Sequence, residues 1–179
     1  TSAMALPNPI NPLIDPTATV TLSIHKYLGS TTNQPNNGTL QTVSGTPLAG
    51  VTFDIYRVGG VDLTTNAGWA SAIALQDYAI TAADIAAGSI TVNSVTYPLT
   101  KVTTVITDAA GLATFTQAAG TGLYLVNENL STSTTSLDES TITPSAPFLV
   151  TLPMTDPTSL SIWMHNVNDY PKNQADSIT

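Results

Sequence analysis

The order of apolar and polar residues along this chain predicts short β-strands. Between residues 18 and 27 every second residue is apolar or carries a long aliphatic stem, and this set consists of Val20, Leu22, Ile24 and Lys26. A period of two is typical of a strand with one buried face. Lys26 therefore shares the apolar side, although a lysine at the inner end of a strand can also extend along its stem to water.

The same alternation, or a short apolar run, predicts further strands along the chain. They span residues 50–58, 102–106, 112–116, 123–128, 146–152 and 160–170, with a weak edge strand at 40–43 and a small hairpin at 89–99. The turn at 108–111 joins the strands on either side of it, so 102–106 and 112–116 are predicted to form a hairpin. Both sides of 123–128 are apolar, which is typical of a central strand.

Residues 59–100 interrupt this β pattern and are predicted to form an insertion. Alanine-rich segments at 67–75 and 82–87 favour two short helices. Thr81 and Asp84 have the spacing of an N-cap and a first-turn acid for the second helix.

Many short strands rich in valine, isoleucine and threonine favour an all-β, immunoglobulin-like sandwich with a small helical insertion. With 179 residues the chain is long enough for one compact domain with a core. We expect this domain to span 18–179, after an extended, proline-rich N-terminal arm at 1–17. Residues 1–4 are compatible with an expression remnant, and we expect further C-terminal domains to be absent from this sequence.

Charge and composition exclude several functional classes. The formal net charge is −8, and only four residues are Lys or Arg. Nucleic acids and anionic membranes are bound through clustered basic side chains, so neither is expected as a partner. Cysteine is absent, which excludes disulfides and a thiol nucleophile. His25 and His165 have no second ligand at metal spacing, so we expect no metal and no cofactor.

Three residues from distant strands form the candidate constellation: Lys26, Glu128 and Asn173. Glu128 is one of only two glutamates and has apolar neighbours; its ordinary explanation is an ion pair or a capped carboxylate. Asp54 is the second candidate for an internal acid, but the alternation predicts that it faces solvent.

The exit of the last predicted strand places a rare lysine beside an amide. Proline cannot continue a sheet ladder and restricts the residue before it, so Tyr170 and Pro171 should end the strand and bring Lys172 and Asn173 to its rim. The ordinary explanation for Lys172 is a solvated lysine in a tail.

Strand alternation separates these two neighbours. If Trp163 and Val167 face the core, odd-numbered positions point inward, so Asn173 points inward and Lys172 points outward. Pro171 can shift this register. The alternation therefore predicts one internal and one intermolecular role.

This exit resembles the pilin motif of Gram-positive sortase-assembled pili. The matching residues are Trp163, Val167, Tyr170, Pro171, Lys172 and Asn173, and Asp169 stands where that family usually carries a second valine. In that family the motif lysine accepts the sorted C-terminus of the next subunit. The resemblance implies that Lys172 is such an acceptor.

Residues 124–129 resemble the E-box of Cna-B-type pilin domains through Tyr124, Val126 and Glu128, whereas Asn129 replaces the usual threonine. In such domains a strand lysine and an asparagine are joined by a self-formed isopeptide bond, assisted by the E-box acid. The resemblance implies that Lys26 and Asn173 form this bond with Glu128 as the acid. Burial favours the uncharged amine and acid that the reaction requires. The reaction runs once per molecule, so the protein is not expected to be an enzyme.

These resemblances run from about residue 18 to 173 and imply the N-terminal domain of a shaft pilin. Such a protein is a structural subunit of a covalently polymerised fimbria, secreted and anchored to a Gram-positive cell wall. The implied partners are neighbouring pilin subunits, a pilus-specific sortase, and a host-cell or bacterial receptor. Residues 152–155 resemble the start of a sorting signal, but Asp156 replaces its glycine, so we expect the sorting signal on a missing C-terminal part.

Two other classes remain open at this stage. A ligand-binding adhesin or a tip or base pilin would contact a host protein or glycan through 59–100 or 129–144, with Trp69 and Tyr78 as exposed aromatic residues. A secreted hydrolase would need a nucleophile and a base in one cleft, and no such pair is evident in the sequence.

Overall fold

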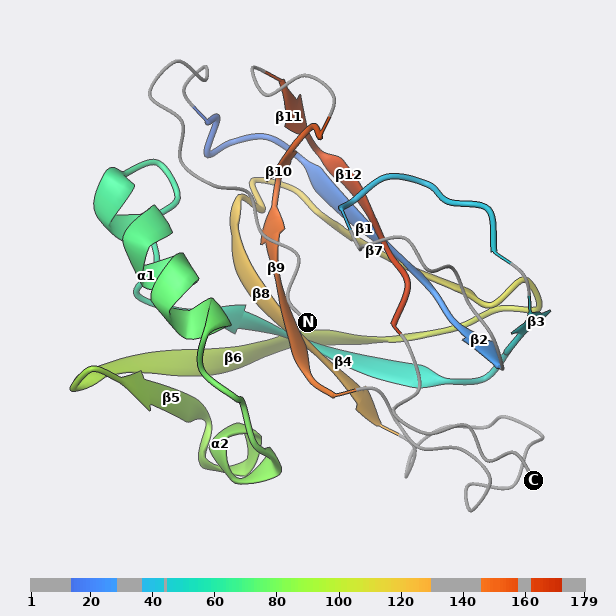
Figure 1. The fold of residues 1–179 in the computed structure, drawn as a ribbon, viewed down its shortest axis with the longest axis horizontal. Helices are drawn as coiled ribbons and strands as arrows, with labels where there is room; N and C mark the ends of the chain where they lie inside the picture. Colours follow the sequence, from blue (N-terminus) through green and yellow to red (C-terminus); the bar gives the residue numbers. More distant parts are fainter. Residues whose placement is uncertain (1–13, 29–36, 44, 130–145, 158–161, 172–179) are drawn as a thin grey trace.

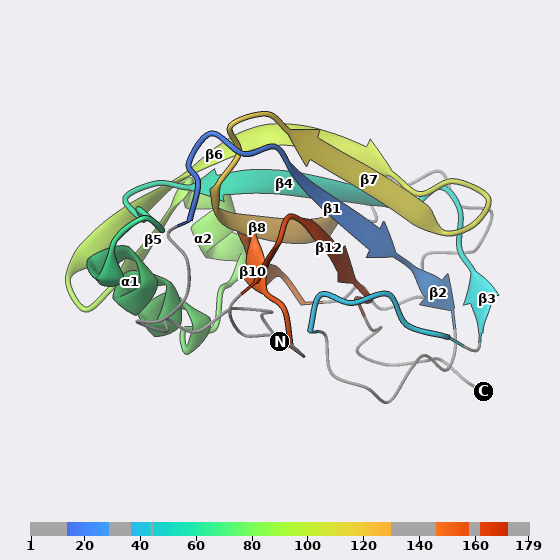
Figure 2. The same ribbon diagram turned by 90° about the horizontal axis from the view of Figure 1, so that it is seen from above.

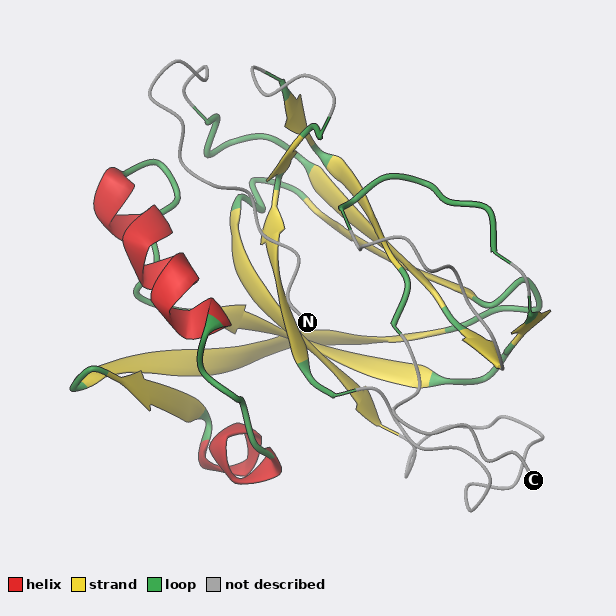
Figure 3. Cartoon of the chain, viewed as in Figure 1, coloured by secondary structure: helices red, strands yellow, loops and turns green. Residues whose placement is uncertain are grey.

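A computed structural model describes residues 14–28, 37–43, 45–129, 146–157 and 162–171. Within these ranges the chain is mostly β-strand, with two short helices (Figures 1 and 3). The elements are β1 (Val20–His25), β2 (Tyr27–Leu28), β3 (Thr46–Pro47), β4 (Thr52–Val58), α1 (Asn66–Gln76), α2 (Ala82–Ala87), β5 (Ser89–Val92), β6 (Val95–Ile106), β7 (Leu112–Gln117), β8 (Gly122–Asn129), β9 (Phe148–Leu152), β10 (Met154–Thr155), β11 (Trp163–Met164) and β12 (Asn166–Asp169).

Two main sheets enclose the apolar core. One has the strand order β5-β6-β4-β8-β9, and the other has the order β12-β1-β7 (Figure 2). Strand β1 pairs antiparallel with β7 and parallel with β12. The sheets contact each other through side chains such as Phe115 of β7 and Tyr124 of β8, whose rings meet edge to face with 5.5 Å between centroids. The predicted all-β sandwich is confirmed, and β8 is central as predicted.

The insertion contains both predicted helices, each with a defined start. Thr65 caps α1, and Thr81 with Asp84 forms a capping box at α2, which satisfies backbone N–H groups that have no partner inside the helix. Trp69 is 4% exposed and donates its indole N–H to the Leu63 carbonyl at 2.7 Å. It is therefore a core residue, and the expectation of an exposed aromatic at this position is wrong.

The β-hairpin predicted for 102–106 and 112–116 is wrong. Strand β6 runs unbroken from Val95 to Ile106 and pairs with β4, whereas β7 pairs with β1 in the other sheet. The turn between them therefore carries the chain from one sheet to the other. The physical reason is burial: Ala113 and Phe115 of β7 are buried, and in the three-stranded sheet they face the core from the opposite side.

Three other boundaries also differ from the sequence predictions. Residues 40–43 form no strand. The predicted strand at 160–170 is divided into β11, which pairs with β10, and β12, which pairs with β1. Ile14 is 7% exposed and packs in the core, so ordered packing begins inside the predicted arm. Short polar segments and breaks between sheets leave little periodic signal in a sequence.

Candidate functional site

Lys26 and Glu128 meet in the interior between the two main sheets. Lys26 directly follows β1, and Glu128 lies near the end of β8. The Lys26 Nζ lies 2.8 Å from the Glu128 Oε1, and both side chains are fully buried. The backbone of Lys26 is fixed as well, because its N–H donates to the Gly111 carbonyl at 2.8 Å and its carbonyl accepts from the Leu48 N–H at 3.0 Å. Lys26 therefore points inward, as predicted from the sequence.

Glu128 reaches this position because successive side chains of β8 point to opposite faces of the sheet. Glu128 lies opposite Phe53 of β4, and Tyr124 and Val126 precede it on the same face. The Tyr124 hydroxyl donates to the Gly120 carbonyl at 2.5 Å, a bond that fixes the start of the strand. Burial raises the pKa of Tyr124, so this hydroxyl remains a donor at neutral pH. Tyr124 thus anchors one end of the strand, and Glu128 lies near its other end.

A buried ion pair of this kind is not explained by stability alone. Removing a carboxylate and an ammonium from water costs several kcal/mol for each ion, and their mutual attraction offsets this cost only in good geometry. Apolar residues of similar volume would often stabilise the fold as well or better. An amine and a carboxyl group in direct contact away from water can exchange a proton, and this is what acylation of an amine requires.

The described residues that match the pilin motif are divided between β11, β12 and the two residues after β12. Val167 lies level with Leu22 in the parallel register between β12 and β1, and Val167 is fully buried. Trp163 lies on the separate strand β11 and stacks on Trp69 of α1, with 5.6 Å between ring centroids. The alternation argument therefore holds for Val167 but does not extend to Trp163, which is only half-buried.

The two residues on which the chemical prediction depends lie outside the described part of the chain. Tyr170 and Pro171 are buried and are the last residues described before them. Lys172 and Asn173 are outside the described residues. The assignment of Lys172 as an acceptor and the pairing of Asn173 with Lys26 therefore remain predictions.

The outer side of the same strand pair holds a cluster that sequence reasoning missed. The His25 ring stacks on the Tyr170 ring with 4.5 Å between centroids and 11° between planes. The His25 Nε2 lies 2.9 Å from the Asn168 Oδ1. The Tyr170 hydroxyl accepts from the Gln41 N–H at 2.8 Å and donates to the Gln41 carbonyl at 3.3 Å. The alternation of Lys26 with His25 was the only signal for this cluster in the sequence.

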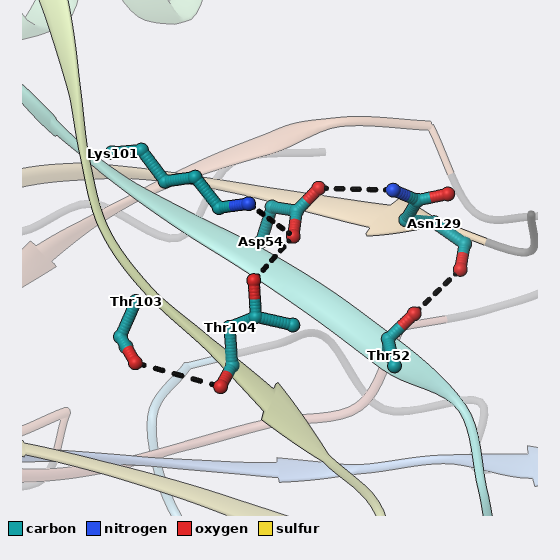
Figure 4. A network of polar contacts seen from close by, with 6 residues as sticks. All are labelled: Thr52, Asp54, Lys101, Thr103, Thr104 and Asn129. Atoms are coloured by element: carbon teal, nitrogen blue, oxygen red, sulfur yellow. Dashed lines mark hydrogen bonds and ion pairs between the residues drawn. The ribbon is translucent and has the colours of Figure 1, made fainter. Parts of the chain in front are cut away.

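Asp54 is buried, so the prediction that it faces solvent is wrong. It is 5% exposed, on the face of β4 opposite to Phe53. One carboxylate oxygen accepts from the Thr104 hydroxyl at 2.7 Å and lies 3.3 Å from the Lys101 Nζ, and the other accepts from the Asn129 amide at 3.2 Å (Figure 4). The prediction considered only which face of β4 carries Asp54, and not the side chains of the neighbouring strands. Side chains from the strands on both sides cover the carboxylate.

Residues 17–174 match the family described as Gram-positive pilin subunit D1, N-terminal domain. The chain belongs to this family. It is 37% identical over 177 residues to the fimbrial subunit type 1 of Actinomyces viscosus, across 97% of this chain and 30% of that protein.

Two solved structures extend this result to the fold. The fimbrial protein FimP of Actinomyces oris is similar with a TM-score of 0.62 and 31% identity, across 93% of this chain and 32% of FimP. The SpaA pilin of Corynebacterium diphtheriae, in a complex with a signal peptide, is similar with a TM-score of 0.60 and 32% identity, across 89% of this chain and 99% of that one. These neighbours confirm the immunoglobulin-like fold class. The pilin domain spans about three tenths of the curated relatives that it matches.

The pilin domain departs from its family motif at Asp169. This side chain is 1% exposed and lies level with Ile24 on the inward side of β12. Burial raises its pKa to about 7. Its Oδ2 has no hydrogen-bond partner among the described residues. A titratable group is thus buried at the position where the sequence departs from the motif that it resembles.

The described residues of the pilin domain contain no group of three or more His, Asp or Glu side chains that could hold a metal ion. Among them there is also no helix long and apolar enough to cross a membrane.

Proposed function

We propose that this chain is the N-terminal domain of a structural subunit of a covalently polymerised cell-surface fimbria, exported and anchored to the cell wall. Its membership of the pilin D1 family across residues 17–174 is the observation that carries this proposal. Relatives described as fimbrial subunits support it. The domain serves as a building block rather than an enzyme.

Lys172 is the proposed acceptor for polymerisation. Its uncharged amine attacks the threonine carbonyl carbon that a pilus-specific sortase holds as an acyl group. The new bond joins the Lys172 nitrogen to that carbon, the bond from the carbon to the sortase nucleophile breaks, and the nucleophile leaves with the proton that the amine gives up. The position of Lys172 directly after Tyr170 and Pro171 in the pilin motif supports this role. Because the SpaA neighbour is a pilin and signal peptide complex, we propose that this domain also meets the sorting signal of the next subunit.

Lys26 and Asn173 are the proposed partners of an internal isopeptide bond. The Lys26 nitrogen forms a bond to the Asn173 side-chain carbonyl carbon, the bond from that carbon to the amide nitrogen breaks, and ammonia leaves with the proton that the amine gives up. Glu128 relays this proton and donates to the carbonyl oxygen while the charge develops. The fully buried contact between Lys26 and Glu128 supports this assignment.

The register of the parallel strands also supports this pairing. Asp169 lies level with Ile24, and the next residue, Tyr170, stacks on His25. Lys26 follows His25 and Pro171 follows Tyr170 directly in the sequence. Asn173 is two residues further along the chain, which is at most about 7 Å of extended backbone.

The intact mass of the purified chain tests the internal bond. We expect a mass lower than the calculated one by a single ammonia, and we expect Lys26→Ala and Glu128→Ala to remove this deficit. Lys101→Ala is the matched control, because it removes a lysine whose carboxylate contact lies elsewhere, and it should keep the deficit. The calculated mass in the unchanged protein would contradict the bond but not the role of Lys172.

A sortase polymerisation assay tests the acceptor. Lys172→Ala and the charge-retaining Lys172→Arg should both abolish the ladder of covalent oligomers, because neither supplies a primary amine. Lys101→Arg should leave the ladder intact. A ladder that persists in Lys172→Arg contradicts the proposed acceptor.

A further inference from the structure

The outer side of the strand exit is held by a chain of contacts that starts at His25. Along β1 the side chains alternate, so that Ile24 and Lys26 are fully buried while His25 is half-buried on the opposite face. The Tyr170 ring covers this face and lies flat on the imidazole. Offset stacking of aromatic rings is worth about 0.5–1.5 kcal/mol beyond the area that it buries.

Asn168 fixes the orientation of the histidine. Its amide Nδ2 donates to the Gly38 carbonyl at 3.4 Å, which turns its Oδ1 toward the imidazole. The Oδ1 can only accept, so the His25 Nε2 carries the hydrogen. The Asn168 N–H donates to the same Gly38 carbonyl at 2.8 Å. The ring is therefore held in one plane from its edge as well as by the stack on its face.

Residues 37–43 close the cluster from the other side. Gly38 and Gln41 of this segment bind Asn168 and the Tyr170 hydroxyl, respectively. Gly38 has φ +88°, and a Cβ built there would lie 2.7 Å from the Met164 side chain. The positive φ favours glycine at this position, and the hydrogen bonds of Gly38 and Gln41 hold the segment against the strand.

We propose that His25 is a positioning residue for the sortase reaction: with Asn168 and Gln41 it fixes the Tyr170 ring, two residues before the proposed acceptor, and so favours acyl transfer to Lys172. The inference rests on the proposed function of Lys172. Tyr170 is two residues before that lysine and is held on its ring face and at its hydroxyl. Because the ring and its hydroxyl are both held, the buried backbone at Tyr170 and Pro171 is held with them.

The effect of positioning is expected on the rate of acyl transfer. Misplacing a reacting group by about 1 Å can cost about a hundredfold in rate, although the group remains accessible. Loss of the histidine ring should therefore slow the sortase reaction far more than it slows the reaction of the same amine with a small reagent. A purely structural role would change both rates together or neither.

The experiment measures kcat and KM for the transfer of a sorting-signal peptide by the pilus-specific sortase onto the 179-residue chain. His25→Ala should lower kcat by about tenfold to a hundredfold with a smaller change in KM. His25→Phe keeps a ring to stack on Tyr170 and should recover most of the rate. His165→Ala is the matched control, because it removes the other histidine, and it should behave as the unchanged protein.

A second readout uses no sortase. Acylation of Lys172 by a small N-hydroxysuccinimide ester, measured by mass spectrometry relative to Lys101, should be the same in His25→Ala and in the unchanged protein. Equal sortase kinetics for His25→Ala and His165→Ala overturn the inference, as does a His25→Phe variant that is as slow as His25→Ala. If His25→Ala does not fold, the rate of His25→Phe is compared with that of Tyr170→Ala. Only Tyr170→Ala lacks the stack, so it should be the slower of the two. Equal rates overturn the inference.

Failure of the proposed function gives a different result. Joining of the peptide to Lys172→Arg, or no joining to the unchanged chain, contradicts the acceptor role itself. Joining through Lys172 alone, with a rate that does not depend on the ring at position 25, contradicts only the inference about His25.

Discussion

Among the residues that the structure describes, two lysines contact a carboxylate, and the two contacts differ in burial and in the elements that they join. Lys26 and Glu128 are 2.8 Å apart with both side chains fully buried. Lys101 and Asp54 are 3.3 Å apart, and the lysine side chain is 52% exposed. The first pair joins the two sheets, whereas the second lies on neighbouring strands of one sheet.

The difference shows how the surroundings decide what the same two groups can do. Water surrounds much of the Lys101 amine, so this pair is screened and contributes little. At Lys26 water is excluded, so the attraction between the amine and the carboxylate is not screened and each group depends on the other. The buried pair is costly for folding and suited to chemistry. The exposed pair is suited to neither a large stabilisation nor a reaction.

The largest expected effect is at the buried pair. Glu128→Ala leaves the Lys26 amine buried without its carboxylate and should lower the free energy of unfolding by about 3–5 kcal/mol, measured by chemical denaturation. Glu128→Gln, which keeps the volume but removes the charge, should also be destabilised. If Glu128→Ala were as stable as the unchanged protein, the buried pair would be no different from the exposed one.

The next effect concerns Asp169, a buried carboxyl group without a lysine contact of this kind. Its folded-state pKa of about 7 is above the ordinary value of 3.8, so its contribution to stability is fully present below about pH 4 and is lost as the pH rises through 7. The shift corresponds to about 4 kcal/mol.

Asp169→Asn should therefore be more stable than the unchanged protein at pH 8 and show no gain at pH 4. Denaturation at both pH values measures this, and Asp169→Val, the residue usual in the family motif, is the second variant. A gain of the same size at pH 4 would show that packing, not ionisation, is responsible.

The smallest effect is expected at the exposed pair. Lys101→Met keeps the aliphatic stem and should change the free energy of unfolding by less than about 1 kcal/mol, with the difference shrinking as salt is added. Thermal unfolding at low and high ionic strength measures it. A loss that approaches that of Glu128→Ala would remove the distinction between the two pairs.

Much of the site followed from alternation in the sequence. The period of two placed Lys26 and Glu128 on inward faces and separated His25 from Lys26, and the turn chemistry at Thr81 and Asp84 located the second helix. The same reasoning misplaced Asp54, because the face of a strand does not show how far neighbouring side chains cover it. It also paired 102–106 with 112–116, because adjacency in sequence cannot show whether a turn stays in one sheet or crosses to the other.

The amino-acid sequence by itself determined the class of fold, the inward lysine and acid, and the motif that leads to Lys172, because each of these depends on local periodicity or on a short run of residues. Only the tertiary structure decided that Lys26 and Glu128 touch, that Tyr170 rests on His25, and that Trp163 rests on Trp69. These contacts join residues that are far apart in the chain. Their geometry depends on how two sheets pack and on the register of a parallel strand pair, neither of which leaves a local pattern in the sequence.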